Sequence, residues 1–164
     1  MKRLGIYART PSNLIIDGIH LTVDALGCDP LKLQNGPLLK KTLDELPEKL
    51  GMNKIADPIV YRYSGEKPED WGYSGFVVIA ESHIAMHTFP NHKFVWIDIF
   101  SCKKFDVGMC EALIKGTFGA TKLRKKIFDR GIELKDVPNA GEWVNEDRKV
   151  RTSIEAMASV AVVE

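Results

Sequence analysis

The chain has 164 residues, 45% of them hydrophobic, which is enough to bury one core, so we expect a single domain. Its 23 basic and 22 acidic residues leave a net charge of +1, so neither nucleic acid nor an acidic membrane surface is expected as a partner. No apolar run approaches the roughly 20 residues that span a bilayer, and the start, MKRLGIYARTPSN, lacks the apolar stretch of a secretory signal, so we expect a cytoplasmic protein.

The three cysteines, Cys28, Cys102 and Cys110, are odd in number and form no C-x-x-C pair. A disulfide framework or a zinc site built from these thiols is therefore not expected. Because free cysteines are among the most often buried residues, Cys28 and Cys110 are predicted to fill the core.

The first part of the chain predicts a strand, a turn and a helix. Residues 18–26, GIHLTVDAL, alternate in the manner of a half-buried strand, and the following GCDP stops it. In residues 36–50, leucines recur at steps of three and four residues, which predicts one apolar helical face. Pro37 suits the first turn of this helix, whereas Pro47 predicts that the helix ends or kinks there.

The middle of the chain predicts strands. Residues 57–63, DPIVYRY, indicate a strand, and the polar residues 64–73 indicate a loop. Residues 74–90 and 93–102 are rich in β-branched and apolar residues, and the NH dipeptide after Pro90 is a turn candidate. We therefore predict that these two runs form a hairpin.

The last part predicts a helix, a strand and a tail. Residues 106–118 form an amphipathic pattern with Asp106 as N-cap and Gly116 or Gly119 near the end. Residues 120–131 indicate an edge strand with lysines and an arginine on one face, and a helix over 142–162 is a further expectation. The order β-α-β-β-β-α-β predicts an α+β fold, a two-layer α/β sandwich with helices on one face of an antiparallel sheet.

The stretch ESHIAMHTFP, residues 81–90, combines residue types that carry chemistry. On an extended strand His83 and His87 share one face and Ser82 lies on the other, unless a bulge or turn intervenes. A zinc site would need a third ligand, and His20 and His92 show no ligand spacing. A serine hydrolase would need an elbow such as G-x-S-x-G, which the chain lacks. A purely structural role, with local hydrogen bonds to the polar groups, stays open from this stretch alone.

A longer pattern resembles a known family. The prokaryotic S-adenosylmethionine decarboxylases, which are pyruvoyl enzymes, carry S-G-x-x-x-I-x-E-S-H-x-x-x-H-T-W-P followed by D-x-F-x-C. The matching residues here are Ser74, Gly75, Glu81, Ser82, His83, His87, Thr88, Pro90, Asp98, Phe100 and Cys102. The resemblance covers roughly residues 18–130. It implies an N-terminal extension at 1–17, a decarboxylase domain at 18–135 and a C-terminal tail at 136–164.

The resemblance implies a proenzyme that cleaves itself. The Ser82 hydroxyl attacks the carbonyl of Glu81, the peptide becomes an ester, and elimination leaves residue 82 as an N-terminal pyruvoyl group. Ser74 resembles the residue that assists this step, and His87 resembles the base that removes the α-proton. The pyruvoyl ketone condenses with a substrate amine and accepts electrons as carbon dioxide leaves, and Cys102 lies where the family has its proton donor. No added cofactor and no metal are implied.

The substrate residues implied by the resemblance are Tyr63 and Phe89, which would stack on adenine, and Asn91, where the family usually has a glutamate. This departure and a longer loop, with Glu66, Glu69 and Asp70 in it, keep a decarboxylase of ornithine or arginine as an alternative. An unprocessed, non-catalytic homologue and a small metal-binding domain are further alternatives. Family members generally form dimers with active sites near the subunit interface, so a homodimer is expected.

Overall fold

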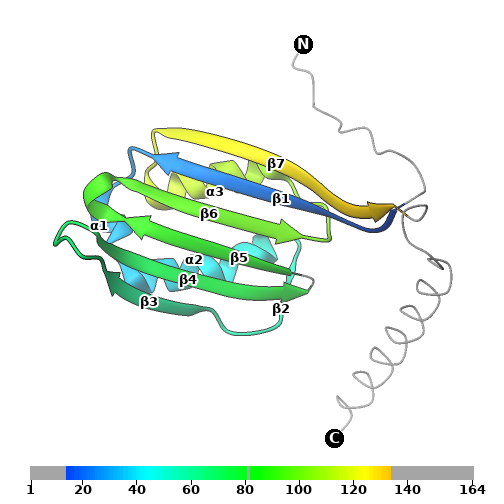
Figure 1. The fold of residues 1–164 in the computed structure, drawn as a ribbon, viewed down its shortest axis with the longest axis horizontal. Helices are drawn as coiled ribbons and strands as arrows, with labels where there is room; N and C mark the ends of the chain where they lie inside the picture. The colour runs from blue at the N-terminus through cyan, green and yellow to red at the C-terminus, as the bar shows by residue number, and fades with distance from the viewer. Residues whose placement is uncertain (1–13, 81, 134–164) are drawn as a thin grey trace, which may run out of the picture. The chain divides into compact units, whose positions relative to one another are not determined.

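The computed structural model describes residues 14–80 and 82–133, and residues Gly18–Arg130 form one compact unit. The strands are β1 (Leu14–Leu26), β2 (Asn53–Lys54), β3 (Ile59–Ser64), β4 (Trp71–Ala80), β5 (Ser82–Phe89), β6 (Phe94–Ser101) and β7 (Lys122–Glu133). The helices are α1 (Pro30–Leu33), α2 (Gly36–Lys49) and α3 (Val107–Phe118), with a 3-10 turn η1 (Pro90–His92) (Figure 1).

The strands form one sheet in the order β2-β4-β5-β6-β1-β7, and β3 also pairs with β4. The pairs β1–β6, β3–β4, β4–β5 and β5–β6 are all antiparallel. The predicted edge position of the last strand is confirmed, because β7 ends the sheet. Strand β5 is central, so its residues have a hydrogen-bonded neighbour on both sides.

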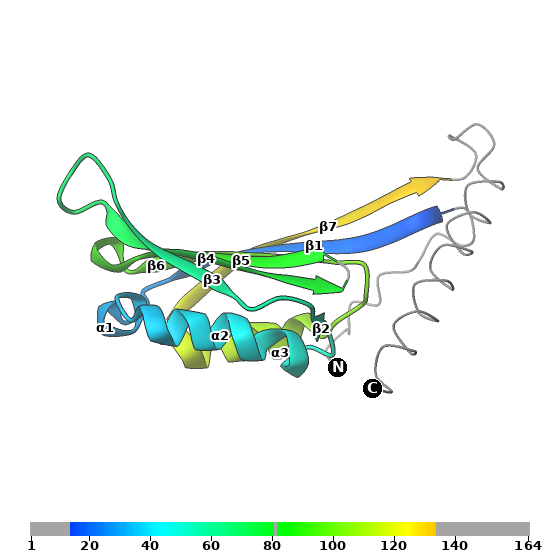
Figure 2. The same ribbon diagram turned by 90° about the horizontal axis from the view of Figure 1, so that it is seen from below.

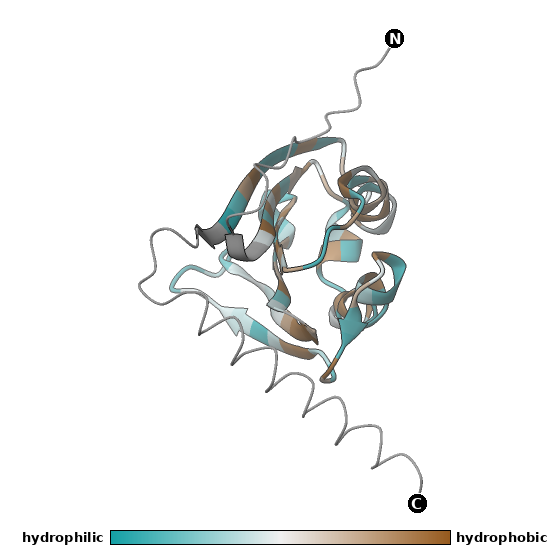
Figure 3. Ribbon diagram, turned by 90° about the vertical axis from the view of Figure 1, so that its right-hand side faces the viewer, coloured by the Kyte–Doolittle hydropathy of each residue, from teal (hydrophilic) through white to brown (hydrophobic). Residues whose placement is uncertain are grey.

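The three helices cover one face of this sheet (Figure 2). The described residues place no helix on the other face, which we call the open face. Side chains alternate between the two faces along each strand. Figure 3 shows that both the strands and the helices contain hydrophobic and hydrophilic segments. The core between helices and sheet includes Leu21, Leu39, Leu43, Ile84, Met86, Ile97, Ile99 and Phe118, each at most 1% exposed. The predicted α+β two-layer sandwich is confirmed.

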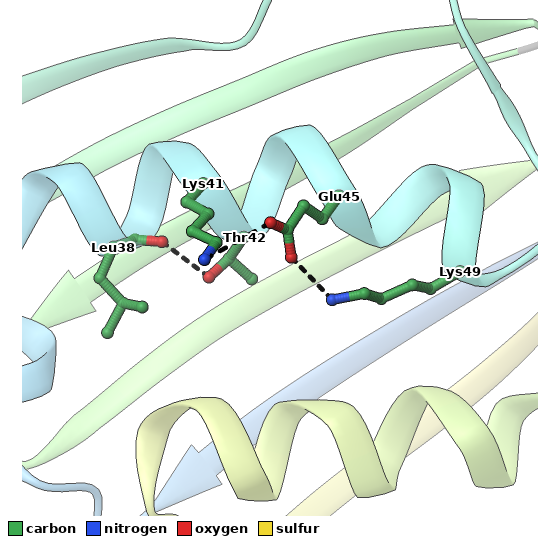
Figure 4. Close-up of polar contacts among 5 residues, drawn as sticks. All are labelled: Leu38, Lys41, Thr42, Glu45 and Lys49. Atoms are coloured by element: carbon green, nitrogen blue, oxygen red, sulfur yellow. Dashed lines mark hydrogen bonds and ion pairs between the residues drawn. The ribbon is translucent and has the colours of Figure 1, made fainter.

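Helix α2 shows how the sequence builds the helical layer. Asn35 caps it by accepting a hydrogen bond from the Leu38 amide at 2.9 Å. On the solvent side Glu45 pairs with Lys41 and Lys49, one turn away in each direction (Figure 4). The prediction was that the helix ends or kinks at Pro47. The helix continues through Pro47 to Lys49, so the first of these two alternatives is wrong. Its last residues lie against the core, where Pro47 and Leu50 are buried.

The sequence analysis missed several elements. The predicted single strand 74–90 is wrong, because the chain reverses between Ala80 and Ser82 and forms β4 and β5. This reversal has no Gly or Pro to signal it, and both flanks are apolar and β-branched. Strand β1 begins at Leu14, β4 begins at Trp71 inside the predicted loop, and α1 follows an Asp29 cap. Helix α3, with its Asp106 cap and Gly119 end, is confirmed.

Some predictions lie outside the described residues, namely the helix at 142–162 and any structural role of Glu81. Among the residues that the structure describes, none of the helices has the length and apolar character that crossing a membrane would require.

Candidate active site

Ser82 is the first residue of β5 and has an unusual backbone. Its φ is 121°, in a region that residues with a side chain rarely adopt. Ser82 nevertheless pairs with Ile79 on β4 and with Ser101 on β6, so the surrounding sheet imposes this conformation. The turn also disturbs the strict alternation of faces, since Ser82 lines the same open-face cavity as His83 and His87. Backbone strain is therefore located at the predicted cleavage point.

Cys102 follows the end of β6 and faces Ser82. Its Sγ lies 3.7 Å from the Ser82 Oγ, and the cysteine is partly exposed. The other two thiols are buried under the sheet, where burial raises the pKa of Cys28 to about 11 and that of Cys110 to about 12. Both are core residues, as predicted. Cys102 is thus the thiol that the fold presents to the predicted reacting serine.

Ser74 and His87 form a second pair. They lie directly opposite each other on β4 and β5, and the His87 Nδ1 is 3.0 Å from the Ser74 Oγ. The following Gly75 allows the close approach behind them, because an added Cβ would lie 2.8 Å from side-chain atoms of Leu43 and Val60. The S-G dipeptide therefore places a hydroxyl on the open face and leaves room for α2 on the other.

The two pairs are separated along the strand. His87 is five positions after Ser82 on β5, which corresponds to about 16 Å in an extended strand. Ser82, Ser74 and His87 line one cavity of about 540 Å³ on the open face, together with His83 and other residues of β3, β4 and β5. The structure brings Ser82 together with Cys102, and Ser74 together with His87. Within one chain it does not bring the His87 imidazole to the Ser82 Cα.

The predicted stacking residues lie still further along β5. Tyr63 and Phe89 meet edge to face with their ring centroids 6.2 Å apart. Phe89 also contacts Phe94 at 4.5 Å and Trp96 at 4.6 Å between centroids, and Trp96 is 47% exposed. We call these four residues the aromatic corner. Phe89 is seven positions after Ser82 on β5, which corresponds to about 23 Å of extended strand.

Asn91 lies in η1 beside this corner. Its Nδ2 donates a hydrogen bond to the Glu69 carbonyl at 3.0 Å. Next to it, His92 Nε2 lies 3.1 Å from the Asp70 Oδ1. The predicted substrate residue Asn91 is therefore also a contact between η1 and the loop that joins β3 to β4.

The buried polar residue Thr88 was not assigned a role from the sequence. It is 0% exposed, and its Oγ1 accepts a hydrogen bond from the Tyr73 amide at 2.9 Å. This contact connects β4 to β5 just beyond the Ser74–His87 pair, so Thr88 has a structural role next to His87. In the described residues, no group of three or more His, Cys, Asp or Glu side chains is arranged to hold a metal ion.

Comparison with known proteins agrees with this geometry. A model of the family described as S-adenosylmethionine decarboxylase matches residues 19–131, well over half of the chain. The chain belongs to the S-adenosylmethionine decarboxylase family. The matched residues run from β1 into β7. They therefore include the Ser74–His87 pair as well as Ser82 and Cys102.

Two relatives of the S-adenosylmethionine decarboxylase family illustrate the extent of the similarity. An S-adenosylmethionine decarboxylase proenzyme from Clostridium botulinum (strain Loch Maree / Type A3) is 35% identical over 115 residues, covering 70% of this chain and 94% of the relative. One from Geobacillus sp. (strain WCH70) is 29% identical over 123 residues, covering 75% of this chain and 94% of the relative.

A solved structure shares the fold of this S-adenosylmethionine decarboxylase family member. The adenosylmethionine decarboxylase from Aquifex aeolicus vf5 superposes with a TM-score of 0.60 at 23% identity, covering 79% of this chain and 97% of that chain. At this identity the likeness supports the fold.

Sequence reasoning missed two features of the site. The first is that Tyr61 and Phe76 line the open-face cavity, which follows from the strand register and has no local motif. The second is the contact of Asp70 with His92, whose partners are 22 residues apart. Neither could be read from the spacing within one strand.

Proposed function

We propose that this chain is an S-adenosylmethionine decarboxylase made as a proenzyme. Its domain at 18–135 cleaves itself between Glu81 and Ser82, and the pyruvoyl group formed at residue 82 serves the decarboxylation of S-adenosylmethionine. The observation that carries the proposal is the φ of 121° at Ser82, in a turn that faces the Cys102 thiol. Membership of the S-adenosylmethionine decarboxylase family supports the same reaction.

The first step is a rearrangement of one peptide bond. The Ser82 Oγ attacks the carbonyl carbon of residue 81, the C–N bond breaks, and the acyl group moves to the oxygen as an ester. A relaxed trans peptide resists this attack, so a strained serine backbone lowers the barrier by destabilising the starting state. The sheet holds Ser82 in place through its pairing with Ile79 and Ser101.

The second step removes the Cα proton of residue 82. The residue 81 carboxylate then leaves from Cβ, and hydrolysis of the new N-terminal residue releases ammonia and leaves the ketone. An imidazole is suited to take the proton, and His87 is held for this purpose by the Ser74 hydroxyl at 3.0 Å. Ser74 is the positioning residue of this pair.

The pyruvoyl group, once present, supplies a ketone that condenses with the substrate amine and accepts the electrons released with carbon dioxide. The residues around position 82 fit such a group, because its site lies on the open face within reach of a partly exposed thiol. Cys102 donates the proton to the carbon that lost its carboxylate. Tyr63 and Phe89 stack on the adenine ring of a substrate whose amine lies at residue 82 of the partner chain.

A denaturing gel and a carbon dioxide release assay test the proposal. Wild-type protein is expected to show two chains, one ending at residue 81 and one beginning at residue 82, in place of one chain of 18.4 kDa. The chain that begins at residue 82 should carry a keto group there. It should release carbon dioxide from S-adenosylmethionine in preference to ornithine and arginine. Ser82→Ala should remain one chain without activity. An active wild-type protein with an intact 81/82 bond would contradict the proposal.

We further propose that the working enzyme is a homodimer whose open faces pack together. Ser82 lies about 16 Å from His87 along the same strand, too far for proton transfer within one chain. The open face also exposes large apolar side chains, namely Ile59, Tyr61, Phe76, Trp96 and Phe128, each at least 41% exposed. A second copy turned end to end across about 10 Å, the usual distance between packed sheets, would place the partner's His87 over Ser82.

Hybrid dimers test this arrangement. Ser82→Ala and His87→Ala chains, carrying different tags, are co-expressed and purified together. If the base acts across the interface, the hybrid contains one complete site, and the His87→Ala chain is cleaved there although it is not cleaved in its own homodimer. If the hybrid leaves both chains intact, the base does not act in trans. A chain carrying both substitutions, co-expressed with His87→Ala, is the matched control, because this hybrid keeps one Ser82 but has no His87 imidazole in either chain and should stay intact.

A further inference from the structure

The loop between β3 and β4 is attached to η1 by two neighbouring contacts. Asn91 donates to the Glu69 carbonyl at 3.0 Å, and the adjacent His92 lies 3.1 Å from the Asp70 carboxylate. The loop is closed from within by the Gly65 amide, which donates to the Asp70 carbonyl. Asp70 is thus held from both its backbone and its side chain, unlike a carboxylate at a free loop tip.

Asp70 lies next to the aromatic corner. Tyr63 donates its hydroxyl to the Thr88 carbonyl at 3.3 Å, and its ring meets Phe89. Burial, and secondarily the nearby negative charge of Asp70, raises the pKa of the Tyr63 phenol. The Asp70 side chain is 47% exposed, and its contact with His92 is made by Oδ1. A fixed carboxylate with an accessible side therefore adjoins the stacking residues.

The substrate limits what this carboxylate can meet. The substrate amine must reach residue 82, and the aromatic corner of the same chain lies about 23 Å away along β5, farther than the two ends of one substrate molecule are apart. In the proposed dimer the partner's aromatic corner, beside the partner's His87, comes close to residue 82, so the part of the substrate at that corner is the nucleoside half. Beyond the base, the hydrogen-bond donors of a nucleoside are its sugar hydroxyls. A carboxylate has acceptors only, and hydrogen bonds to an ionised acceptor are about twice as strong as neutral ones.

We propose that Asp70 binds the sugar hydroxyls of the nucleoside half of the substrate, and that His92 and Asn91 position it for this contact. The inference rests on the proposed function, because it takes the substrate to be a nucleoside. It makes the loop that joins β3 to β4 a determinant of specificity. Asn91, with an amide in place of an acidic group, serves by holding the loop.

Direct binding of methylthioadenosine tests the assignment without requiring turnover. Its affinity for cleaved wild-type protein is compared by calorimetry with that of the analogue lacking both sugar hydroxyls. Asp70→Asn keeps the shape of the side chain and removes its charge. It should weaken methylthioadenosine binding by about 10-fold and change binding of the analogue by less than about twofold. Glu66→Gln, in the same loop, is the matched control and should change neither.

Other outcomes overturn the proposal. An equal loss for both ligands would mean that Asp70 only supports the loop, and no loss for either would mean that it contacts no hydroxyl. Wild-type protein that binds neither nucleoside would likewise refute the contact. Self-cleavage and carbon dioxide release by the same preparations report on the proposed function separately, so a protein that cleaves and decarboxylates normally but fails the binding test loses only the Asp70 assignment.

The positioning role of His92 has its own readout. His92→Ala should reduce the preference for methylthioadenosine over the analogue by about threefold, since Asp70 loses one fixed contact. His92→Gln can still donate to the carboxylate and should restore most of that preference. A purely structural role would lower affinity for both ligands and would leave their ratio unchanged.

Discussion

The start and the end of β5 carry different chemistry on one strand. At its start, Ser82 has a strained backbone and faces a thiol 3.7 Å away. At its end, Phe89 lies among three further aromatic rings, beside a loop held by Asn91 and His92. The Ser74–His87 pair lies between them, nearer the aromatic end. A single strand therefore separates the residues proposed for bond rearrangement from those proposed for ligand recognition.

This separation has a consequence for how variants behave. Changes at the start of β5 should affect self-cleavage and turnover, whereas changes at its end should affect ligand affinity and leave self-cleavage intact. His87 lies towards the end of β5 but should affect self-cleavage, because the proposed dimer places it against the partner's Ser82. The predictions below test the division from the largest expected effect to the smallest.

The largest effect is expected for His87→Ala. Without the imidazole the ester at residue 82 forms but its Cα proton stays, so the two-chain product should be absent. Hydroxylamine cleaves esters and spares ordinary peptide bonds, so it should cut the stalled protein at the 81/82 junction, as mass spectrometry would detect. Wild-type-like cleavage without hydroxylamine would show that another group removes the proton. Ser82→Ala is the control that hydroxylamine should not cut.

Cys102→Ala should separate cleavage from turnover. The variant is expected to form two chains, because the thiol is not the attacking group, while carbon dioxide release falls by about 100-fold or more through loss of the proton donor. Gel densitometry and the release assay on one sample measure both. The buried Cys110→Ala is the matched control, and its turnover per cleaved chain should be unchanged. Normal turnover of Cys102→Ala would assign protonation elsewhere.

Phe89→Ala should act on affinity alone. Loss of base stacking is worth about 1–3 kcal/mol, so KM for S-adenosylmethionine should rise by about 5-fold or more. The fraction of cleaved chain should match wild type, because a phenyl ring supplies neither the nucleophile nor the base that self-cleavage requires. Phe89→Trp retains the aromatic face and should keep a low KM. A Phe89→Ala protein that binds S-adenosylmethionine normally but does not cleave itself would contradict the role given to Phe89.

The prediction with the smallest bearing on function concerns the burial of the thiols and requires no mutation. In the folded state burial raises the pKa of Cys28 to about 11 and of Cys110 to about 12, above the ordinary value of 9.0. A higher pKa means less thiolate at a given pH, so at pH 8 these two should react with iodoacetamide at least about 100-fold more slowly than they do in denaturant. Peptide mapping should find the label at Cys102 first. Equal labelling of all three cysteines would contradict the burial.

Much of the fold could be predicted from the sequence. The leucine spacing of α2, the Asp106 cap of α3 and the alternation in β1 are local signals, and each element forms as expected. The order of elements was enough for the two-layer sandwich. The division of residues 74–90 into two strands was missed, since the reversal depends on antiparallel pairing across the sheet and has no glycine or proline to mark it.

Which residues belong to the candidate site could be predicted from the sequence, but not which of them lie next to one another. The spacing of Ser74, Ser82, His87 and Cys102 identified the family that the comparisons then showed. Their grouping was not predictable, because partners in a sheet are set by register between strands. The pairing of Ser74 with His87, and of Ser82 with Cys102, results from that register.

The sequence by itself determined which residue types the chain offers and which local elements they form, because capping, periodicity and side-chain chemistry act over a few residues. Tertiary structure alone decided the positive φ at Ser82, the pairing of Ser82 with Cys102, and the contact of Asp70 with His92. Each of these depends on segments distant in the chain that the sheet brings side by side, and no local pattern encodes such distances.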